Sequence, residues 1–211
     1  MAKIGLNNFR YSGLTEASDG TATYDGAKIP AKAISCTVEI TNNEAMLYAD
    51  DVLSESDTTF NKADVTICID DDDTATMAYL LGHDYDDATH EMVRNSADQA
   101  PYIGFGRIIT KMVGGAYKYK VEALLKVKFS EPSQEDNTKG ESVEFATTEL
   151  SGIASTLANG DWSKSCTFDD KEDAVTYLEG LFAPANAPAE PAEPAEPGET
   201  TETTNTETTN P

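Results

Sequence analysis

Hydrophobic and polar residues alternate without a break along residues 116–129. Every second residue from Tyr117 to Phe129 is apolar or aromatic, and four of the six residues between them are lysines. Because successive side chains of a strand point to opposite faces of a sheet, this pattern predicts a half-buried β-strand. Fourteen residues at roughly 3.3 Å each would span about 46 Å, whereas strands usually have about 5–6 residues. A strand of this length is typical of proteins that build extended walls.

The preceding residues complete a long hairpin over residues 102–129. Gly-Gly at 114–115 can occupy the two positive-φ positions of a tight turn. In this register the pairing runs from Val113 opposite Ala116 to Tyr102 opposite Val127, and the apolar residues of both limbs share one face. The other face carries the charge of the hairpin, including six basic residues: Arg107, Lys111, Lys118, Lys120, Lys126 and Lys128.

The remaining patterns predict shorter elements. Alternation predicts strands at residues 31–40, 60–70, 143–148 and 164–168, and the polar N-terminal stretch to residue 26 is interpreted as an arm or loop with a short strand at 9–12. Helices are predicted at 74–81, between Asp73 and Gly82, and at 171–179, capped by Asp169 or Asp170. Residues 84–99 and 130–140 read as irregular. The sequence therefore predicts a mainly β fold with one or two short flanking helices.

Residues 42–59, between two predicted strands, read as an 18-residue loop. A loop of this length is usually functional or disordered. Its acidic residues are Glu44, Asp50, Asp51, Glu55 and Asp57, and its apolar residues are Met46, Leu47, Tyr48, Val52 and Leu53. Solvated loops seldom keep this much apolar surface, so we expect the loop to dock on another surface.

Charge and composition exclude several classes of function. The 211 residues carry a net charge of −23; residues 184–211 hold six of the 38 acidic residues and no basic one, which leaves −17 for the rest. Such a surface repels nucleic-acid phosphates. No stretch approaches the about 18 apolar residues of a membrane span, and no catalytic motif or metal-ligand spacing stands out. We expect no enzymatic activity, no metal and no cofactor.

The last 28 residues differ from the rest. Pro-Ala-Glu occurs three times and Thr-Glu-Thr-Thr-Asn twice, with no aromatic residue. Such a segment cannot bury enough surface to offset its ordering entropy, so we expect a folded domain at 1–183 and a disordered tail at 184–211, with a polyproline bias in its first half. The tail is interpreted as inert or as a spacer.

Several stretches resemble the major tail protein (tail tube protein) of long-tailed bacteriophages, the siphophage family. The likeness spans roughly residues 1–182 and lies in the order and spacing of motifs, not in a catalytic signature. The motifs are Asn8-Phe9-Arg10-Tyr11-Ser12, Tyr48-Ala49-Asp50-Asp51, Leu80-Leu81-Gly82-His83, Gly104-Phe105-Gly106-Arg107, Lys126-Val127-Lys128-Phe129-Ser130-Glu131-Pro132 and Thr138-Lys139-Gly140-Glu141. The Pro-rich tail departs from the family, in which some members end after the last helix and others add an immunoglobulin-like domain.

This resemblance implies a tail-tube-type β-sandwich or part-barrel with a long hairpin and a flanking helix. It also implies hexameric rings that stack into a tube, the conduit for phage DNA, built on a tape-measure protein and joined to tail terminator and baseplate proteins. The protein would then be synthesised and assembled in the host cytoplasm and reside in the virion. DNA would pass through without stable binding, and no membrane would be involved.

The charge pattern suggests how subunits meet. We expect the 42–59 loop to reach an adjacent subunit, where its apolar residues pack and its carboxylates meet the six hairpin cations. Reversing Asp50 and Asp51 to Lys would then give monomers that do not polymerise. A solvated loop beside a soluble cationic face is the alternative, and the sequence leaves open which face would line the tube.

Two other functions share this composition. A phage capsid decoration protein would have the same class of fold but would usually trimerise. A surface or secreted β-sandwich binding module could use the Thr/Pro/Glu tail as a cell-wall spacer, but it should begin with a signal peptide, and the N-terminal residues show none.

Overall fold

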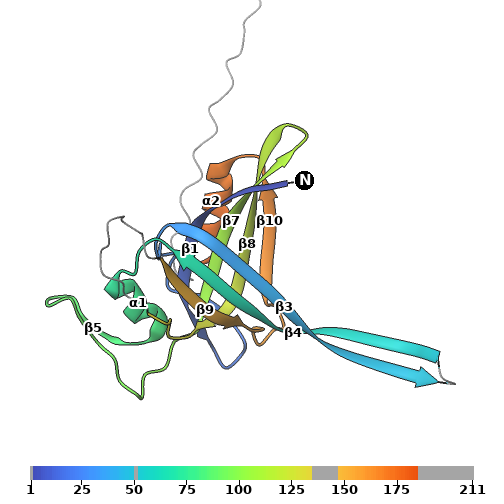
Figure 1. The fold of residues 1–211 in the computed structure, drawn as a ribbon, viewed down its shortest axis with the longest axis horizontal. Coiled ribbons are helices and arrows are strands. Elements are labelled where there is room, and N and C mark those ends of the chain that lie inside the picture. The colour runs from blue at the N-terminus through green and yellow to red at the C-terminus, as the bar shows by residue number, and fades with distance from the viewer. Residues whose placement is uncertain (1, 50–51, 135–146, 185–211) are drawn as a thin grey trace, which may run out of the picture.

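A computed structural model describes residues 2–49, 52–134 and 147–184. Its main feature is one antiparallel sheet of eight strands in the order β2-β1-β7-β8-β9-β4-β3, with β10 also pairing with β8 (Figure 1). A separate two-stranded sheet joins β5 to β6. The strands are β1 (Ala2–Glu16), β2 (Ala22–Tyr24), β3 (Ala33–Ala49), β4 (Val52–Ile69), β5 (Asp84–Asp86), β6 (Glu91–Val93), β7 (Ile103–Val113), β8 (Ala116–Phe129), β9 (Thr148–Ala154) and β10 (Ser163–Phe168). The predicted mainly β fold is confirmed.

The large sheet is curved but does not close into a barrel. β1 and β3 approach each other although they lie far apart in the pairing order. The main core fills the concave side and includes Phe9, Phe105 and Phe129, whose rings meet edge to face at centroid distances of 5.2 and 6.1 Å. These aromatic contacts hold β1, β7 and β8 in one curved wall.

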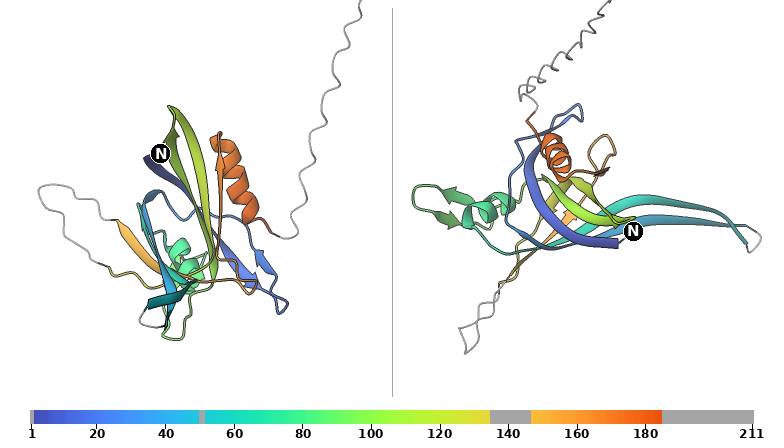
Figure 2. Two further views of the ribbon diagram at one scale, coloured as in Figure 1. Left: turned by 90° about the vertical axis from the view of Figure 1, so that its right-hand side faces the viewer. Right: turned by 90° about the horizontal axis from the view of Figure 1, so that it is seen from above.

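A second core lies on the opposite face of β7 and β8. Helix α2 (Lys171–Leu181) covers this face, as Figure 2 shows, and packs Leu178 and the adjoining Phe182 against Ile108 and Val121. Helix α1 (Thr74–Leu81) instead contributes Leu80 and its neighbours to the main core. The Asp73 cap of α1, its end at Gly82 and the Asp170 cap of α2 are as predicted.

The predicted register of the β7–β8 hairpin is confirmed over most of its length. Pairing runs from Val113 opposite Ala116 to Phe105 opposite Leu124, and the turn glycines have φ of 60° and 85°. A one-residue shift follows, so that Val127 pairs with Ile103 and not with Tyr102. This irregularity corrects the predicted unbroken alternation.

The shift also changes the face to which the end of β8 points. Val121 and Ala123 belong to the core beneath α2, whereas Val127 and Phe129 belong to the main core. One strand therefore serves both cores. The expectation that all alternate residues from Tyr117 to Phe129 share one face is wrong, because an extra residue in the ladder reverses the alternation beyond it.

The predicted loop at 42–59 is also wrong. β3 and β4 pair from Ala33 opposite Ile69 to Ala49 opposite Val52, so these residues form the outer part of a hairpin. Figure 1 shows it projecting away from the rest of the molecule. We call residues 42–49 and 52–59 the arm.

Two further predictions need correction, and a third lies mostly outside the described residues. β1 extends over Ala2–Glu16, where a polar arm with a short strand at 9–12 was expected. Residues 84–99 contain the β5–β6 hairpin. The strand expected at 143–148 falls mostly outside the described residues, and β9 begins only at Thr148. For β1, a partner distant in sequence, β7, supplies the pairing that local polarity did not predict.

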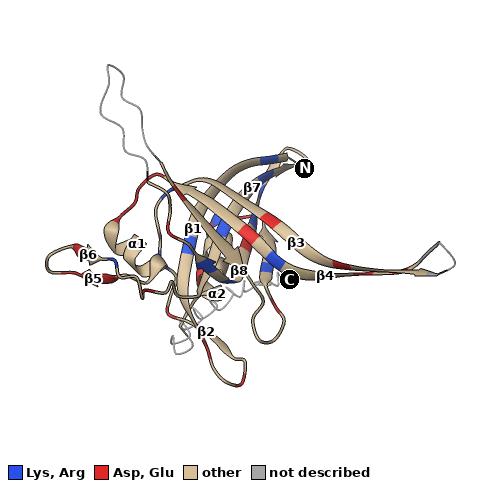
Figure 3. Ribbon diagram, turned by 60° about the horizontal axis from the view of Figure 1, so that its bottom comes forward, with Lys and Arg blue, Asp and Glu red and all other residues tan. Residues whose placement is uncertain are grey.

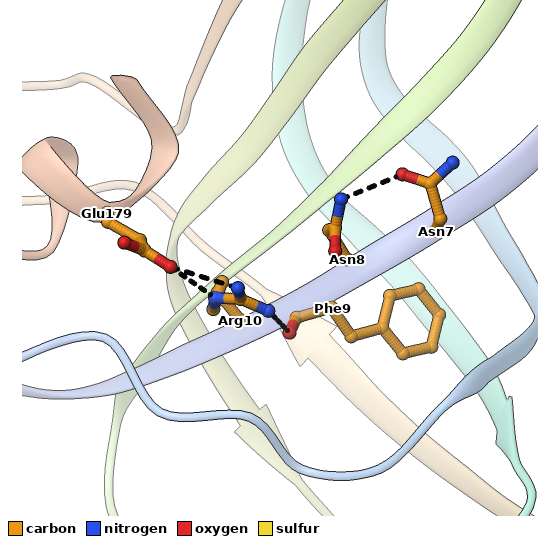
Figure 4. A network of polar contacts seen from close by, with 5 residues as sticks. All are labelled: Asn7, Asn8, Phe9, Arg10 and Glu179. Atoms are coloured by element: carbon orange, nitrogen blue, oxygen red, sulfur yellow. Dashed lines mark hydrogen bonds and ion pairs between the residues drawn. The ribbon is translucent and has the colours of Figure 1, made fainter. Parts of the chain in front are cut away.

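An ion pair fixes α2 to β1 (Figure 4). The guanidinium of Arg10 donates to Glu179 Oε1 at 2.9 and 3.0 Å and to the carbonyl oxygen of Phe9 at 3.1 Å. The pairing of β1 with β7 shifts between Asn7 and Arg10, and Asn8 has φ of 53° there. This bulge lets Phe9 enter the main core while Arg10 reaches the helix on the opposite face.

Gly104 gives a direct test of how closely the helix end packs on the sheet. A Cβ at this position would overlap Phe182 Cε1 and lie 2.8 Å from Tyr24 Cε1. Both aromatic rings would have to move to make room for the new methyl group, and a packed core leaves them little space. Gly104→Ala should therefore destabilise the fold by about 1–3 kcal/mol. Gly5→Ala is the matched control, because nothing lies within 4 Å of its added Cβ. Urea unfolding would contradict this if both variants had the parent midpoint.

Asp25 ties α1 to the sheet through four hydrogen bonds. Its carboxylate accepts from Tyr79 (2.6 Å), Gly13 N–H (2.7 Å), Lys28 (2.8 Å) and Ser12 (2.9 Å). Burial alone raises the pKa of Asp25, but the hydrogen bonds outweigh burial and lower the pKa from 3.8 to about 2. The carboxylate form is therefore favoured by folding.

This pKa predicts a loss of stability in acid. Because the folded pKa is depressed, the contribution is complete above pH of about 4 and disappears as pH falls towards 2. The side chain is 44% exposed, so we expect about 1 kcal/mol after solvent screening. In urea unfolding, Asp25→Asn should be less stable than the parent at pH 5, and this difference should close as pH falls to 2. Asp72→Asn, at an exposed position, should follow the parent throughout. Parallel curves for Asp25→Asn and the parent would contradict the assignment.

Candidate self-assembly surface

The arm exposes apolar side chains to solvent. Met46, Leu47 and Tyr48 are 55, 57 and 63% exposed. The eight residues of β3 beyond residue 41 extend the hairpin by about 26 Å at strand spacing. An isolated two-stranded ribbon is marginally stable in water. The arm therefore has the character of a segment completed by contact with another surface.

The arm is also uniformly acidic. Residues 33–61 contain no Lys or Arg. Leu47 pairs with Glu55 and Ala45 with Asp57, so apolar and carboxylate side chains lie next to each other on one face of the ribbon. Glu44 lies on the other face, two residues from Met46.

Four of the predicted site residues cannot be placed in full. Asp50 and Asp51 lie outside the described residues. Val52 and Leu53 begin β4, where they pair with Ala49 and Tyr48. The described part of the arm thus brings together Met46, Leu47, Tyr48, Glu55 and Asp57 of the predicted set.

The six hairpin cations do not share one face. Beyond the register shift, Lys126 pairs with Glu16, and the ammonium groups of Lys126 and Lys128 lie 4.8 and 5.5 Å from the ring centre of Tyr102. Glu16 has a lowered pKa because it accepts hydrogen bonds from Lys126 and from a backbone amide. The prediction that all six cations share one face is therefore wrong. Only the four residues before the shift share it: Arg107, Lys111, Lys118 and Lys120.

Three of these four cations contact carboxylates of their own chain. Arg107, 8% exposed, donates to Glu122 Oε2 at 2.6 Å, and Lys120 pairs with the other oxygen of Glu122. Burial raises the pKa of Glu122, but the two cations prevail and lower it. Lys118 pairs with Asp169, which is exposed.

A cationic row crosses three strands, and the predicted hairpin register accounts for two of its three members. Lys3 of β1 lies opposite Lys111 of β7, and Lys111 lies opposite Lys118 of β8. We call these three residues the lysine row. Among the described residues, no carboxylate comes within 4.0 Å of the Lys3 or Lys111 ammonium. Like charges directly opposite each other destabilise a sheet.

Lys3, at one end of the lysine row, lines a groove on the face opposite α2. The groove has a volume of about 320 Å³ and is lined by Lys3, Arg107 and Lys120 together with Glu122 and the indole of Trp162, among others. Phe60 stacks on Trp162 at 4.3 Å between ring centres. The cationic groove, as we call it, combines positive charge with an apolar wall.

Within one chain, the arm and the cationic groove do not meet. Among the described residues, no ion pair joins an arm carboxylate to a hairpin cation. Figure 3 shows acidic positions along the projecting hairpin and basic positions gathered on β1, β7 and β8. Complementary charges therefore lie on separate surfaces of one copy.

These features define a class of protein: an open antiparallel sheet with a projecting acidic arm and a separate cationic groove. No protein-family model matches the chain, and no curated protein matches it. Neither helix in the described ranges is long and apolar enough to cross a membrane.

The lysine row predicts a mutation that stabilises the free chain. Lys111→Thr removes the central charge and keeps a residue suited to strands, so it should raise the free energy of unfolding by about 0.3–0.5 kcal/mol. The gain should shrink in 0.5 M salt because screening weakens the repulsion. Lys32→Thr removes an exposed lysine outside the row that lies 3.6 Å from Asp70, so this control should show no such gain. A lower urea midpoint for Lys111→Thr at low salt would contradict the repulsion.

Proposed function

We propose that this protein is the structural subunit of a bacteriophage tail tube, which assembles into stacked hexameric rings that conduct DNA. The observation that carries the proposal is the arm, an acidic ribbon whose apolar side chains are exposed in the part of the chain that the structure describes. The resemblance of the motifs to tail tube proteins supplies the particular assembly.

The open sheet supports the same proposal. In the described residues, β3 pairs only with β4 and β10 only with β8, so both leave a row of backbone groups without strand partners. Exposed strand edges promote pairing with other chains. A ring with closed symmetry satisfies such edges without producing open-ended aggregates. Self-association into rings therefore suits the geometry better than action as a monomer.

Charge complementarity suggests how one copy recognises another. The carboxylates of the arm would approach the cationic groove of a neighbouring copy, while Met46, Leu47 and Tyr48 pack on its surface. Exposed ion pairs contribute little affinity but set orientation and association rate. The apolar residues would supply most of the binding free energy.

The remaining roles follow from the resemblance. A tape-measure protein would occupy the growing tube, and tail terminator and baseplate proteins would bind its ends. DNA would pass through without stable binding, since an acidic chain offers few phosphate contacts. Assembly would occur in the host cytoplasm and the product would reside in the virion.

The arm can be tested by replacing its apolar residues. Met46→Ser, Leu47→Ser and Tyr48→Ser together should abolish assembly, because the interface loses its apolar contacts. The fold should persist, since these side chains are exposed in the single chain. Ile153→Ser, at an exposed apolar position on β9, is the control on the body. Sedimentation and negative-stain microscopy would report assembly, and urea unfolding would report the fold.

The parent protein and the Ile153→Ser variant should form tubes with six-fold rings, and the triple variant should remain monomeric with an unchanged urea midpoint. Tubes formed by the triple variant would refute the role of the arm. Three-fold particles without tubes from the parent chain would favour a capsid decoration protein instead.

A further inference from the structure

We propose that the cationic groove of a free subunit is occupied by the acidic C-terminal segment of the same chain, residues 190–202. Lys3 and Lys111 have no carboxylate within 4.0 Å among the described residues, Glu122 alone serves both Arg107 and Lys120, and residues 184–211 carry six carboxylates and no basic residue. The contact itself does not depend on the proposed function.

The groove is arranged to receive a negative strand. Adjacent strands lie about 4.8 Å apart, so the outer ammonium groups of the lysine row project from backbones about 9.6 Å apart. Arg107 and Lys120 share Glu122, which leaves an excess of positive charge along the groove. Because like charges opposite each other cost stability, an anionic occupant would relieve that cost.

The tail carries its carboxylates with a matching period. Glutamates stand at every third position, 190, 193, 196, 199 and 202, and prolines at 188, 191, 194 and 197. A polyproline II helix has three residues per turn and rises about 3.1 Å per residue. In that conformation the five carboxylates would align on one edge at intervals of about 9.3 Å. Successive glutamates would therefore meet Lys3 at one end of the lysine row and compete with Asp169 for Lys118 at the other.

The tail is long enough to reach the groove. Pro184, the last described residue, lies beside Gly26. Residues 190 and 202 follow it by six and 18 positions, or about 19 to 56 Å in an extended chain. A body of this size has a radius of gyration of about 16 Å. The segment can thus pass round the sheet from the α2 face to the groove.

Attachment to the same chain favours the tail over the arm of a second copy. A tethered segment has an effective concentration of the order of millimolar, far above the concentration of other copies in dilute solution. Both the tail and the arm are acidic, so they compete for the same cations. If the proposed function holds, the tail delays assembly until a neighbouring arm displaces it, which would limit premature polymerisation.

Carbodiimide cross-linking of the full-length monomer tests the contact, because this reagent joins carboxylates to amines that touch. Mass spectrometry should find links from the tail glutamates to Lys3, Lys111, Lys118 or Lys120. The Glu16–Lys126 ion pair serves as an internal positive control. Replacing all five glutamates (E190Q, E193Q, E196Q, E199Q and E202Q) should remove the tail links and leave the control link.

Matched lysine variants test where the tail binds. Lys111→Gln with Lys118→Gln should lower the yield of tail links to Lys3 and Lys120 about fivefold, as expected for the loss of two exposed ion pairs. Lys32→Gln with Lys62→Gln, the same charge change outside the groove, should leave that yield unchanged. Salt at 0.5 M should suppress the links in the parent.

Two results would overturn the proposal. Tail links spread equally over Lys32, Lys62 and the groove lysines would indicate non-specific attraction. Groove lysines linked only to Glu44, Glu55 or Asp57, and only in cross-linked dimers, would assign the groove to the arm of a second copy.

Assembly kinetics separate this inference from the proposed function. If the chain forms tubes, the five Glu→Gln substitutions should shorten the lag before polymerisation several-fold at equal concentration; an unchanged lag would refute the regulatory role. If neither protein forms tubes, the proposed function fails, whereas the cross-links still decide whether the tail binds the groove.

Discussion

The one-residue shift in the pairing of β7 with β8 is the constraint on which the rest of the structure depends. Before the shift, β8 directs Val121 and Ala123 towards α2; after it, the same strand directs Val127 and Phe129 into the main core. A regular ladder would have placed all four on one side. Because one strand serves two cores, a single sheet can bind a helix on one face and still curl round a core on the other. The shift also separates the basic residues, which leaves a compact cationic groove in place of a long cationic face.

Local signals in the sequence correctly predicted the features that depend on neighbouring residues, namely the tight turn and the helix caps. The Gly-Gly turn fixed the hairpin register up to Phe105, and the capping residues Asp73 and Asp170 located both helices. The arm was missed because alternation marks a strand only where one face is buried, and both faces of the arm are exposed. A weaker signal was present: residues 31–81 contain neither Gly nor Pro, which is unusual for a stretch expected to hold a long loop.

The candidate site was predicted only in part, for a related reason. The hairpin register placed Arg107 opposite Glu122 but could not show that Lys120 shares this carboxylate or that Asp169 pairs with Lys118. Lys3 was overlooked because it reaches the groove through a strand pairing that spans more than a hundred residues. Bulges are equally hidden, since one extra residue leaves no mark in composition yet reverses every side chain beyond it. The position of Lys3 and the bulges depend on pairing between distant strands, so the pattern of hydrophobic and polar residues alone could not predict them.

The charge of the body limits how copies can approach. Outside the last 28 residues the chain carries −17, so two copies repel each other at long range. At 0.1 M salt this repulsion is screened beyond about 10 Å, whereas charges in contact are screened much less. In the proposed assembly, an orientation that brings an acidic arm against a cationic groove would turn the net repulsion into local attraction. Because eight of the 15 basic residues lie on β1, β7 and β8, few such orientations would exist (Figure 3). In the proposed assembly, the net repulsion keeps free copies apart, and the placement of the cations makes their association selective.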